Sequence, residues 1–583
     1  MTALISKVMV AVGDQVTKGQ ELVILEAMKM ENAIIAESHG QIDKIFFSEG
    51  DTVKADDKIL SYSILSNGKP KQELTQTTQI GTSAIDELRG RKKFIDDSNR
   101  PAAVEKRRKK DQNTARENIA RLADADSFKE YGALIVAAQS TRRSMEDLIE
   151  NTPADGLVAG IGSVNQDLFP DEKTQCLIMA YDFTVLAGTQ GTMNHMKMDR
   201  MIALGIKNKL PTILFAEGGG GRPGDVDVAT VAGLYINTFI AYAQLSIHAP
   251  TIAIVSGYCF AGNAALAGSS DIIIGTENIS IGMGGPAMVE GGGLGKFHPR
   301  EIGPANSQVE NGVIDILVRD ENEAIDTAKK YLSYCQGPSN KWEQEDQIKL
   351  QDFIPQNRKR TYDIKALIKL LADKDEVIEL KSDYGKGLIT AMIRVEGHAM
   401  GLMANNTSFE AGAITSENAI KASEFMELCD KNNLPILTLV DTPGIMVGPE
   451  AERSGTVKHA SKMFRVSAKI KVPIMGVVVR RAYGLGAMAM VGGGMHVPEF
   501  MVSWPTGEFG AMGLEGAVRL GYKKELEAVA DEKERQKLFD KMVQHAYDRG
   551  KATSAATMLE IDDVIEPKDT RSWISQCLKT ISK

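Results

Sequence analysis

The sequence TIAIVSGYCFAGNAAL, from Thr251 to Leu266, decides the fold. Its first five residues are apolar and lie between Pro250 and Gly257, a pattern that predicts a buried strand. The small residues from Ala261 onward predict the start of a helix. A strand that turns sharply into a helix leaves the first N–H groups of that helix unpaired and open to approach. The stretch therefore predicts an α/β domain in which backbone amides can stabilise an oxyanion.

The same pattern occurs again about 224 residues later. The apolar run of residues 472–479 leads through Tyr483 into Gly484-Leu485-Gly486-Ala487. Two further pairs of segments share this offset: Leu210-Pro211 with Leu434-Pro435, and a helical stretch at Lys197 with one at Lys421. Three matches at one offset predict two homologous α/β domains, which we expect at residues 101–340 and 345–583.

The first 65 residues alternate short apolar runs with Gly and Asp turns, which is typical of short strands. Val12-Gly13-Asp14 recurs 37 residues later as Glu49-Gly50-Asp51, so this segment contains two similar halves. Two such halves predict a flattened barrel with a pseudo-dyad. The sequence EAMKM, residues 26–30, falls near the midpoint, which places Lys29 on an exposed hairpin. We expect residues 1–65 to form a small all-β domain.

Residues 66–100 are polar and predict a linker with a helical segment near residues 85–88. The basic run Lys106-Arg107-Arg108-Lys109-Lys110 follows, but acidic residues come directly after it and no aromatic residues interleave with it. We interpret this run as a solvated helix face and expect no nucleic-acid partner. An alternative is that the run, or Arg116, attracts the phosphates of a nucleotide-bearing substrate.

The composition argues against several classes of protein. A net charge of −9 with 43% hydrophobic and 25% charged residues is ordinary for a folded soluble chain. The five cysteines contain no CxxC pair and the eight histidines no HExxH pair, so we expect neither a disulfide scaffold nor a metal site. The uncharged residues 228–270 are interrupted by polar residues and glycines, which argues against a membrane span. The N-terminus has no signal-peptide pattern, so a cytoplasmic location is expected.

Between residues 100 and 583, five segments resemble the carboxyltransferase component of biotin-dependent acyl-CoA carboxylases, within the crotonase superfamily. The segments are Thr114–Glu117, Gly257–Gly262, Asp441–Gly444, Arg481–Gly484 and Trp504–Thr506. The EAMKM segment resembles the biotinylation sequence of biotin carboxyl carrier domains rather than the usual lipoyl sequence. The resemblance implies an α/β fold class with two tandem crotonase-like β-β-α superhelix domains, preceded by a small all-β biotinyl domain.

The resemblance also implies the chemistry. The first carboxyltransferase domain binds a coenzyme A thioester, and the N–H groups of Ala261 and Gly262 hold the thioester oxyanion. The second domain receives biotin, and the N–H groups of Leu485 and Gly486 hold its ureido oxygen. The biotin is attached to Lys29. Its carboxyl group passes to the α-carbon of the acyl-CoA, giving a product such as malonyl-CoA or methylmalonyl-CoA.

The sequence departs from the family pattern in three places. Carrier domains normally open with a strand that contains a Pro-Met-Pro-Gly-like segment, and this first strand is expected to be missing. Family members often have Gly-Gly where Ala261-Gly262 stands and Gly-Gly-Ala where Gly484-Leu485-Gly486 stands. Met488 lies where some short-chain carboxylases carry a specificity residue, and an apolar residue there suits a hydrophobic acyl chain.

The resemblance implies three partners besides the acyl-CoA: further copies of the chain in a homo-oligomer, expected as a hexamer; a separate biotin carboxylase subunit; and a biotin protein ligase. No membrane partner is expected of such a component. Two alternatives stay open. One is a biotin-dependent acyl-CoA decarboxylase component that runs the transfer in reverse, and the other is a crotonase-fold scaffold without activity.

Overall fold

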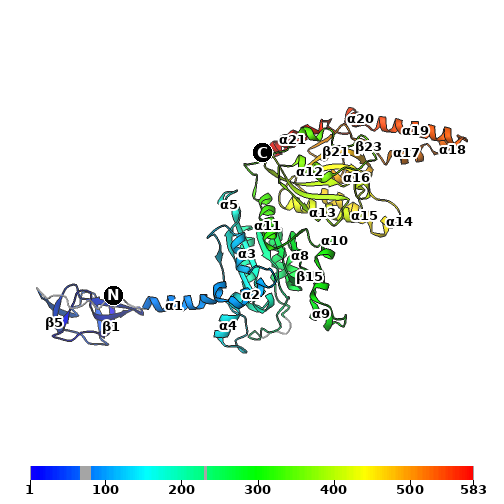
Figure 1. Ribbon diagram of the computed structural model, residues 1–583. Helices are drawn as coiled ribbons and strands as arrows, with labels where there is room; N and C mark the ends of the chain where they lie inside the picture. Colours follow the sequence, from blue (N-terminus) through cyan, green and yellow to red (C-terminus); the bar gives the residue numbers. More distant parts are fainter. Residues whose placement is uncertain (1, 66–79, 229–232, 582–583) are drawn as a thin grey trace. The chain divides into compact units, whose positions relative to one another are not determined.

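The computed structural model describes residues 2–65, 80–228 and 233–581 (Figure 1). The chain divides into two compact units, of which the first ends at Asp86 and the second begins at Glu87. No helix within the described ranges is long and apolar enough to cross a membrane.

The first unit consists of two small antiparallel sheets around one apolar core. Its strands are β1 (Thr2–Val8), β2 (Gln15–Val16), β3 (Glu21–Ala27), β4 (Met30–Ile35), β5 (Gly40–Ile45), β6 (Thr52–Lys54) and β7 (Leu60–Ile64). One sheet has the order β4-β3-β1-β6 and the other β2-β5-β7. Ile5 and Val23 of the first sheet and Ile42 of the second are buried together in the core.

The repeat of 37 residues is visible in this unit as a pairing of strands. The shift carries β1, β2 and β3 onto β5, β6 and β7, so β6-β1-β3 in one sheet corresponds to β2-β5-β7 in the other. In the first sheet β4 lies beside β3. The corresponding place beside β7 holds no strand among the described residues.

The second unit contains two α/β halves, which we call the N half (residues 101–340) and the C half (residues 345–583). The N half is built on a seven-stranded sheet of order β16-β14-β12-β11-β10-β9-β8. Its strands are β8 (Lys129–Glu130), β9 (Leu157–Ser163), β10 (Gln175–Tyr181), β11 (Thr212–Phe215), β12 (Thr251–Val255), β14 (Ile272–Thr276) and β16 (Ile316–Val318), and β13 (Tyr258–Phe260) pairs separately with β15 (Ser280–Gly282). Its helices are α2 (Pro101–Arg108), α3 (Ala115–Leu122), α4 (Met145–Asn151), α5 (Asp171–Thr174), α6 (Thr192–Asn208), α7 (Thr238–His248), α8 (Gly262–Gly268), α9 (Pro286–Gly291), α10 (Ala305–Glu310) and α11 (Glu321–Gln336).

The C half repeats this sheet strand for strand. Its order is β17-β18-β19-β20-β21-β22-β24, with β23 paired to the end of β21. The strands are β17 (Val377–Leu380), β18 (Leu388–Val395), β19 (His398–Asn405), β20 (Ile436–Thr442), β21 (Ile474–Tyr483), β22 (Phe500–Ser503), β23 (Glu508–Gly510) and β24 (Asp563–Val564). The helices are α12 (Ile364–Leu371), α13 (Ser416–Lys431), α14 (Pro449–Arg453), α15 (Thr456–Ser467), α16 (Gly484–Met490), α17 (Leu514–Gly521), α18 (Lys523–Glu527), α19 (Glu532–Arg549), α20 (Ala552–Thr557) and α21 (Thr570–Ile581). In both halves the first two pairings are antiparallel and the later ones parallel.

The duplication extends to strained backbone. Leu186 and Ala187 have positive φ values of 48° and 54°, and Glu410 and Ala411, 224 positions later, have values of 48° and 52°. Positive φ is uncommon for residues other than glycine. Two residues that share it in both copies indicate that the turn before α6 and the turn before α13 have the same geometry.

The two halves share one apolar core, and helix α11 lies between them. This helix contacts α3 and β14 of the N half and also β18 and β19 of the C half. Buried residues of both halves, among them Ile325 of α11 and Met392 of β18, belong to one cluster. Lys431 of the C half makes an ion pair with Asp271 of the N half. The halves therefore fold against each other within the second unit.

The segment expected as a linker has structure of its own. Residues 66–79 lie outside the described residues. Helix α1 (Ile80–Lys92) includes the helical segment expected near residues 85–88. Beyond it, Ile95 is buried and Arg100 makes an ion pair with Asp182 at 2.9 Å. Residues 93–100 thus pack on the N half and do not form a free linker.

Candidate active site

Lys29 stands at the tip of a two-residue hairpin between β3 and β4. Ala27 pairs with Met30, and the two residues between them, Met28 and Lys29, have φ values of 55° and 65°. Type I′ hairpin turns require positive φ at both central residues. Met28 is 89% exposed, and Lys29 is exposed as well. The turn therefore presents the lysine amine to solvent, as the sequence predicted.

The N half has its candidate site where β13 meets α8. Ala261 precedes the helix with φ 51° and ψ −118°, a conformation that L-residues rarely adopt. Its N–H donates to the carbonyl of Gly282 at 3.0 Å. The N–H groups of Gly262 and Asn263 in the first turn make no hydrogen bond to another described residue. The prediction that Ala261 donates to a ligand is therefore corrected: its amide is already committed, whereas that of Gly262 is available.

A glycine loop after β11 lies against this turn. Gly220 has a φ of +86°, and a Cβ placed on it would lie 2.6 Å from the Cβ of Ala261. The N–H of Gly220 donates to Asn263 Oδ1 at 2.9 Å. The glycine cluster of residues 218–221 thus allows two backbone segments to approach closely at the start of α8.

The C half has the same arrangement where β21 meets α16. Gly444, 224 positions after Gly220, has a φ of +119°. A Cβ on Gly486 would lie 2.6 Å from the Cα and the carbonyl carbon of Gly444. Leu485 is 60% exposed and Gly486 is buried, and neither N–H makes a hydrogen bond to another described residue. The two predicted residues therefore both offer amides at this second site.

The backbone also fixes how the two turns correspond. Phe260 pairs with Gly282 in the N half, and Tyr483 pairs with Gly510 in the C half. The next residue has positive φ in each case, 51° at Ala261 and 56° at Gly484. The offset at this point is therefore 223 rather than 224, so that Gly262 and Asn263 correspond to Leu485 and Gly486.

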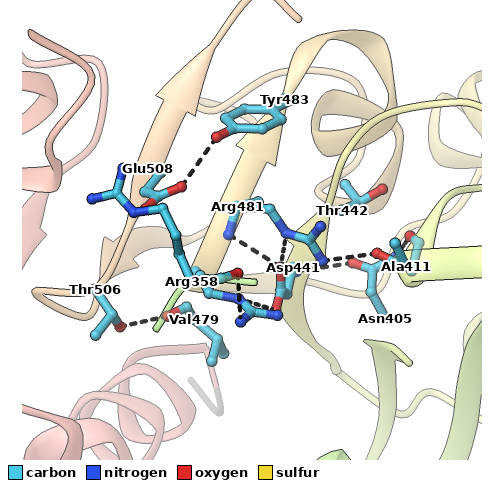
Figure 2. Close-up of polar contacts among 12 residues, drawn as sticks. Arg358, Asn405, Ala411, Asp441, Thr442, Val479, Arg481, Tyr483, Thr506 and Glu508 are labelled. Carbon is cyan, nitrogen blue, oxygen red and sulfur yellow. Dashed lines mark hydrogen bonds and ion pairs between the residues drawn. The ribbon is translucent and has the colours of Figure 1, made fainter. Parts of the chain in front are cut away.

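A buried carboxylate lies behind the second site. Asp441 Oδ1 accepts from Arg481 Nε at 2.7 Å, while Oδ2 accepts from Arg480 Nε and Tyr362 Oη, each at 2.9 Å. Figure 2 shows the Arg481 guanidinium reaching on to the carbonyl of Ala411, at 2.8 Å. The ion pair therefore joins the end of β20, the end of β21 and the strained turn before α13.

The corresponding acid of the N half is Glu217, which lies 224 positions before Asp441. Burial raises the pKa of its carboxyl to about 7, against the opposing charge of Arg107. Arg107 Nη1 lies 2.7 Å from Glu217 Oε2, and Nη2 lies 3.1 Å from Glu321 Oε1. Arg107 is thus a buried ion-pair partner, and the interpretation of the whole basic run as a solvated helix face is wrong at this residue. A run of five basic residues does not reveal which one of them is buried in an ion pair.

Further polar groups line the end of β21. Glu508 accepts from Tyr483 Oη at 3.1 Å and pairs with Arg358 Nε at 3.3 Å, as Figure 2 shows. Burial raises the pKa of the Glu508 carboxyl. The Arg358 guanidinium lies 3.7 Å from the ring centre of Tyr547. In the N half, Arg116 is paired with Glu130 at 2.9 Å. Among the described residues no three His, Cys, Asp or Glu side chains gather as a metal site.

Comparison with known proteins identifies the family. Residues 106–583 match the family described as "Carboxyl transferase domain", and residues 1–61 match "Biotin-requiring enzyme". The chain belongs to the carboxyl transferase family. The resemblance recognised in the sequence is thereby confirmed, and biotin is the cofactor that the first domain requires.

Relatives and solved structures support this assignment. The methylmalonyl-CoA carboxyltransferase 12S subunit of Propionibacterium freudenreichii subsp. shermanii is 29% identical over 85% of this chain and 93% of the relative. The carboxylase YngE of Bacillus subtilis (strain 168) is 31% identical over 74% of this chain and 85% of the relative. A structure of a single-chain, multi-domain long-chain acyl-CoA carboxylase is 46% identical, with a TM-score of 0.82 over 99% of this chain. This chain spans 55% of the length of that carboxylase. A transcarboxylase 12S structure, described as a hexamer assembly, is 27% identical with a TM-score of 0.74 over 88% of this chain and 97% of that one.

The packing roles of four residues of this carboxyltransferase site could not be read from the sequence, although Asp441 and Gly444 stand in a segment that carries the family resemblance. Gly220 and Gly444 approach the helix starts, and Glu217 and Asp441 anchor the strands behind them. The offset of 224 residues already matches Glu217 with Asp441 at the ends of their strands. The same offset, extended into the loops, would also have matched Gly220 with Gly444.

Proposed function

We propose that this chain transfers a carboxyl group from biotin on Lys29 to the α-carbon of an acyl-CoA thioester. The observation that carries the proposal is the pair of homologous half-sites, each with a glycine loop pressed against two unpaired amides at the start of a helix. We further assign the two halves to tandem crotonase-like domains, with the carrier in residues 1–65 and the boundaries expected from the sequence.

The N half receives the acyl-CoA. The N–H groups of Gly262 and Asn263 donate to the thioester oxygen and stabilise the negative charge that develops on it when the α-carbon becomes a nucleophile. These amides are fixed by the backbone before the substrate arrives, so no reorganisation is needed during the reaction. Removing one donor from such a site typically raises the barrier by about 2.7–4 kcal/mol.

The C half receives biotin. When bound to Lys29, biotin supplies an activated carboxyl group on its ureido ring. The hairpin fits this role, because Lys29 is exposed and is held by strands on both sides. The N–H groups of Leu485 and Gly486 hold the ureido oxygen, and the Asp441 ion pair with Arg480 and Arg481 keeps the end of β21 in place beneath them.

The acyl chain is expected to be long and apolar. In the N half, a Cβ on Gly262 would lie 3.2 Å from Cζ of Phe239, which places an aromatic ring of α7 beside the thioester site. Ile240 on the same helix is 60% exposed. The greater identity to the long-chain acyl-CoA carboxylase than to the 12S subunit agrees with this surface.

Assembly and partners follow the relatives. We propose a hexamer, a biotin carboxylase on another chain or on another part of the same polypeptide, and a biotin protein ligase that modifies Lys29. We propose the direction toward carboxylation of the acyl-CoA. The reverse reaction is the alternative function, since the same half-sites would serve it.

A panel of carboxyacyl-CoA thioesters tests the proposal. Transfer of the carboxyl group to free biotin is measured for malonyl-CoA, methylmalonyl-CoA and a long-chain carboxyacyl-CoA, which requires neither the partner nor Lys29. We expect transfer by the wild type and loss of transfer in Gly262→Val and Gly486→Val. Transfer with none of the three thioesters, or normal transfer in both variants, would refute the assignment.

A further inference from the structure

Gln190 is a buried amide at the centre of the N half-site. The residue is 3% exposed, and its backbone N–H donates to the carbonyl of Gly220 at 2.8 Å. A Cβ on Gly262 would lie 1.9 Å from Gln190 Oε1 and 2.9 Å from its Cδ. The side chain of Gln190 therefore lies directly over the first residue of α8.

Half of this amide has no protein partner. Gln190 Nε2 lies 2.8 Å from Tyr181 Oη, a buried contact. Oε1 faces Gly262 and makes no hydrogen bond to any described residue. Although the residue as a whole is buried, this oxygen keeps some contact with solvent, so a ligand that enters from solvent can reach the amide end. The amide end of Gln190 without a protein partner lies over the first residue of α8, whose own N–H is also unpaired, which indicates a place for a polar ligand.

The C half shows that the backbone does not require a polar side chain here. Ile414 stands 224 positions after Gln190 in the same cradle, with its N–H donating to the carbonyl of Gly444 at 3.0 Å. Ile414 is 1% exposed. The fold is thus satisfied by an apolar residue at this position, and the amide belongs to the chemistry of the N half.

We propose that Gln190 is a catalytic residue that donates a side-chain hydrogen bond to the thioester oxygen of the acyl-CoA, together with the Gly262 amide. This inference rests on the proposed function of the N half. Gln190 would add a side-chain donor to a site otherwise made of backbone N–H groups. Such a donor distinguishes the acyl-CoA half-site from the biotin half-site, where Ile414 stands at this position.

The hydrogen bonds around Gln190 allow this role. A glutamine amide can rotate by 180° about its last torsion without changing its shape. After rotation, Nε2 faces Gly262, and Oε1 accepts from the Tyr181 hydroxyl. Tyr181 Oη otherwise lies 3.6 Å from Met198 Sδ, which is only a weak acceptor. A carbonyl oxygen bound beside Gly262 favours the rotated orientation, because only that orientation offers it an N–H.

The test compares two CoA ligands with wild-type enzyme, Gln190→Leu and Gln190→Glu. One ligand is a carboxyacyl-CoA thioester, and the other is the matching thioether, in which a methylene replaces the carbonyl. We expect Gln190→Leu to slow carboxyl transfer about 100-fold and to weaken thioester binding. The Kd of the thioether should stay within about twofold of the wild type, which also shows that the variant is folded.

Gln190→Glu separates a donor from a merely structural residue. Glutamate keeps the size of glutamine and can still accept from Tyr181, so a structural role predicts a milder defect than in Gln190→Leu. A donor role predicts a more severe defect, because a carboxylate repels the developing oxyanion. Equal losses for thioester and thioether, or faster transfer in Gln190→Glu than in Gln190→Leu, would overturn the proposal for Gln190. If the wild type itself neither transfers nor binds either ligand, the proposed function of the N half fails instead.

Discussion

Gly444 lies so close to Gly486 that a Cβ on Gly486 would be 2.6 Å from both the Cα and the carbonyl carbon of Gly444. Real Cβ atoms essentially never approach backbone at this distance, and neither segment can rotate away as a side chain could. In the N half, the nearest atom to a Cβ on Gly262 is Gln190 Oε1, at 1.9 Å. Gly262 corresponds to Leu485 and not to Gly486, so the two glycines occupy different positions in the half-sites, and each is confined by a different kind of neighbour.

Alanine at these two glycines is therefore expected to have unequal effects. Gly486→Ala must displace the start of α16, and we expect transfer to free biotin to fall at least 100-fold, as for loss of an oxyanion donor. Gly262→Ala meets side chains and not backbone, namely the amide end of Gln190 and, at 3.2 Å, Cζ of Phe239, so we expect a smaller loss of about 10-fold. Steady-state transfer rates measure both, with circular dichroism as a control for folding. A larger defect in Gly262→Ala than in Gly486→Ala would contradict this account of the packing.

Lys29→Arg should abolish attachment of biotin without changing the half-sites. Arginine keeps the positive charge and the hairpin, but its guanidinium is not the amine that biotin ligation requires. Lys18→Arg, on another exposed turn of the same unit, is the matched control. Mass spectrometry of chains expressed with an active biotin ligase should show the added mass in wild type and Lys18→Arg but not in Lys29→Arg. All three should transfer carboxyl to free biotin at the same rate, and a loss of this transfer in Lys29→Arg alone would contradict a role of Lys29 confined to carrying biotin.

The duplication and the turns at the active site could be predicted from the sequence, because buried parallel strands are continuous apolar runs and helix starts follow them closely. The hydrogen bond from the Ala261 N–H to the carbonyl of Gly282 could not be predicted in this way. It depends on the pairing of β13 with β15, two strands of three residues each, which are too short to give a period. The placement of Gln190 over Gly262 joins positions 72 residues apart through a loop, and no local pattern encodes such a contact. The biotinyl hairpin was predictable because both of its residues are adjacent in the chain.

The pKa of Glu217 makes the stability of the N half depend on pH. Burial raises this pKa from an ordinary value of 4.5 to about 7, so the folded chain keeps a proton that the unfolded chain has released. Stability from this group is therefore complete below about pH 4.5 and is lost as the pH rises to about 7, by an amount on the order of 3 kcal/mol. Glu217→Gln should flatten the decline in thermal midpoint between pH 5 and pH 7.5. Glu277→Gln, at an exposed site, should decline as the wild type does, and equal slopes in all three proteins would contradict the prediction.

Asp441→Asn should destabilise the C half more than its small change in shape suggests. The carboxylate accepts from Arg480 and Arg481, and the side chain of Arg480 is 4% exposed. Removing one partner of a buried ion pair typically costs about 3–5 kcal/mol, because the remaining charge is left without compensation. Asp548→Asn removes a partner of Lys551 on the surface, where such pairs contribute about 0–1 kcal/mol. Thermal midpoints should fall clearly for Asp441→Asn and hardly for Asp548→Asn.

Asp441→Asn should also affect activity, because Arg481 holds the carbonyl of Ala411 as well as Asp441. We expect this variant to lose transfer to free biotin at temperatures where it is still folded. The N half should keep its affinity for the thioether ligand. If Asp441→Asn lost transfer to free biotin and thioether binding together, Asp441 would support the whole unit and not the biotin half-site alone.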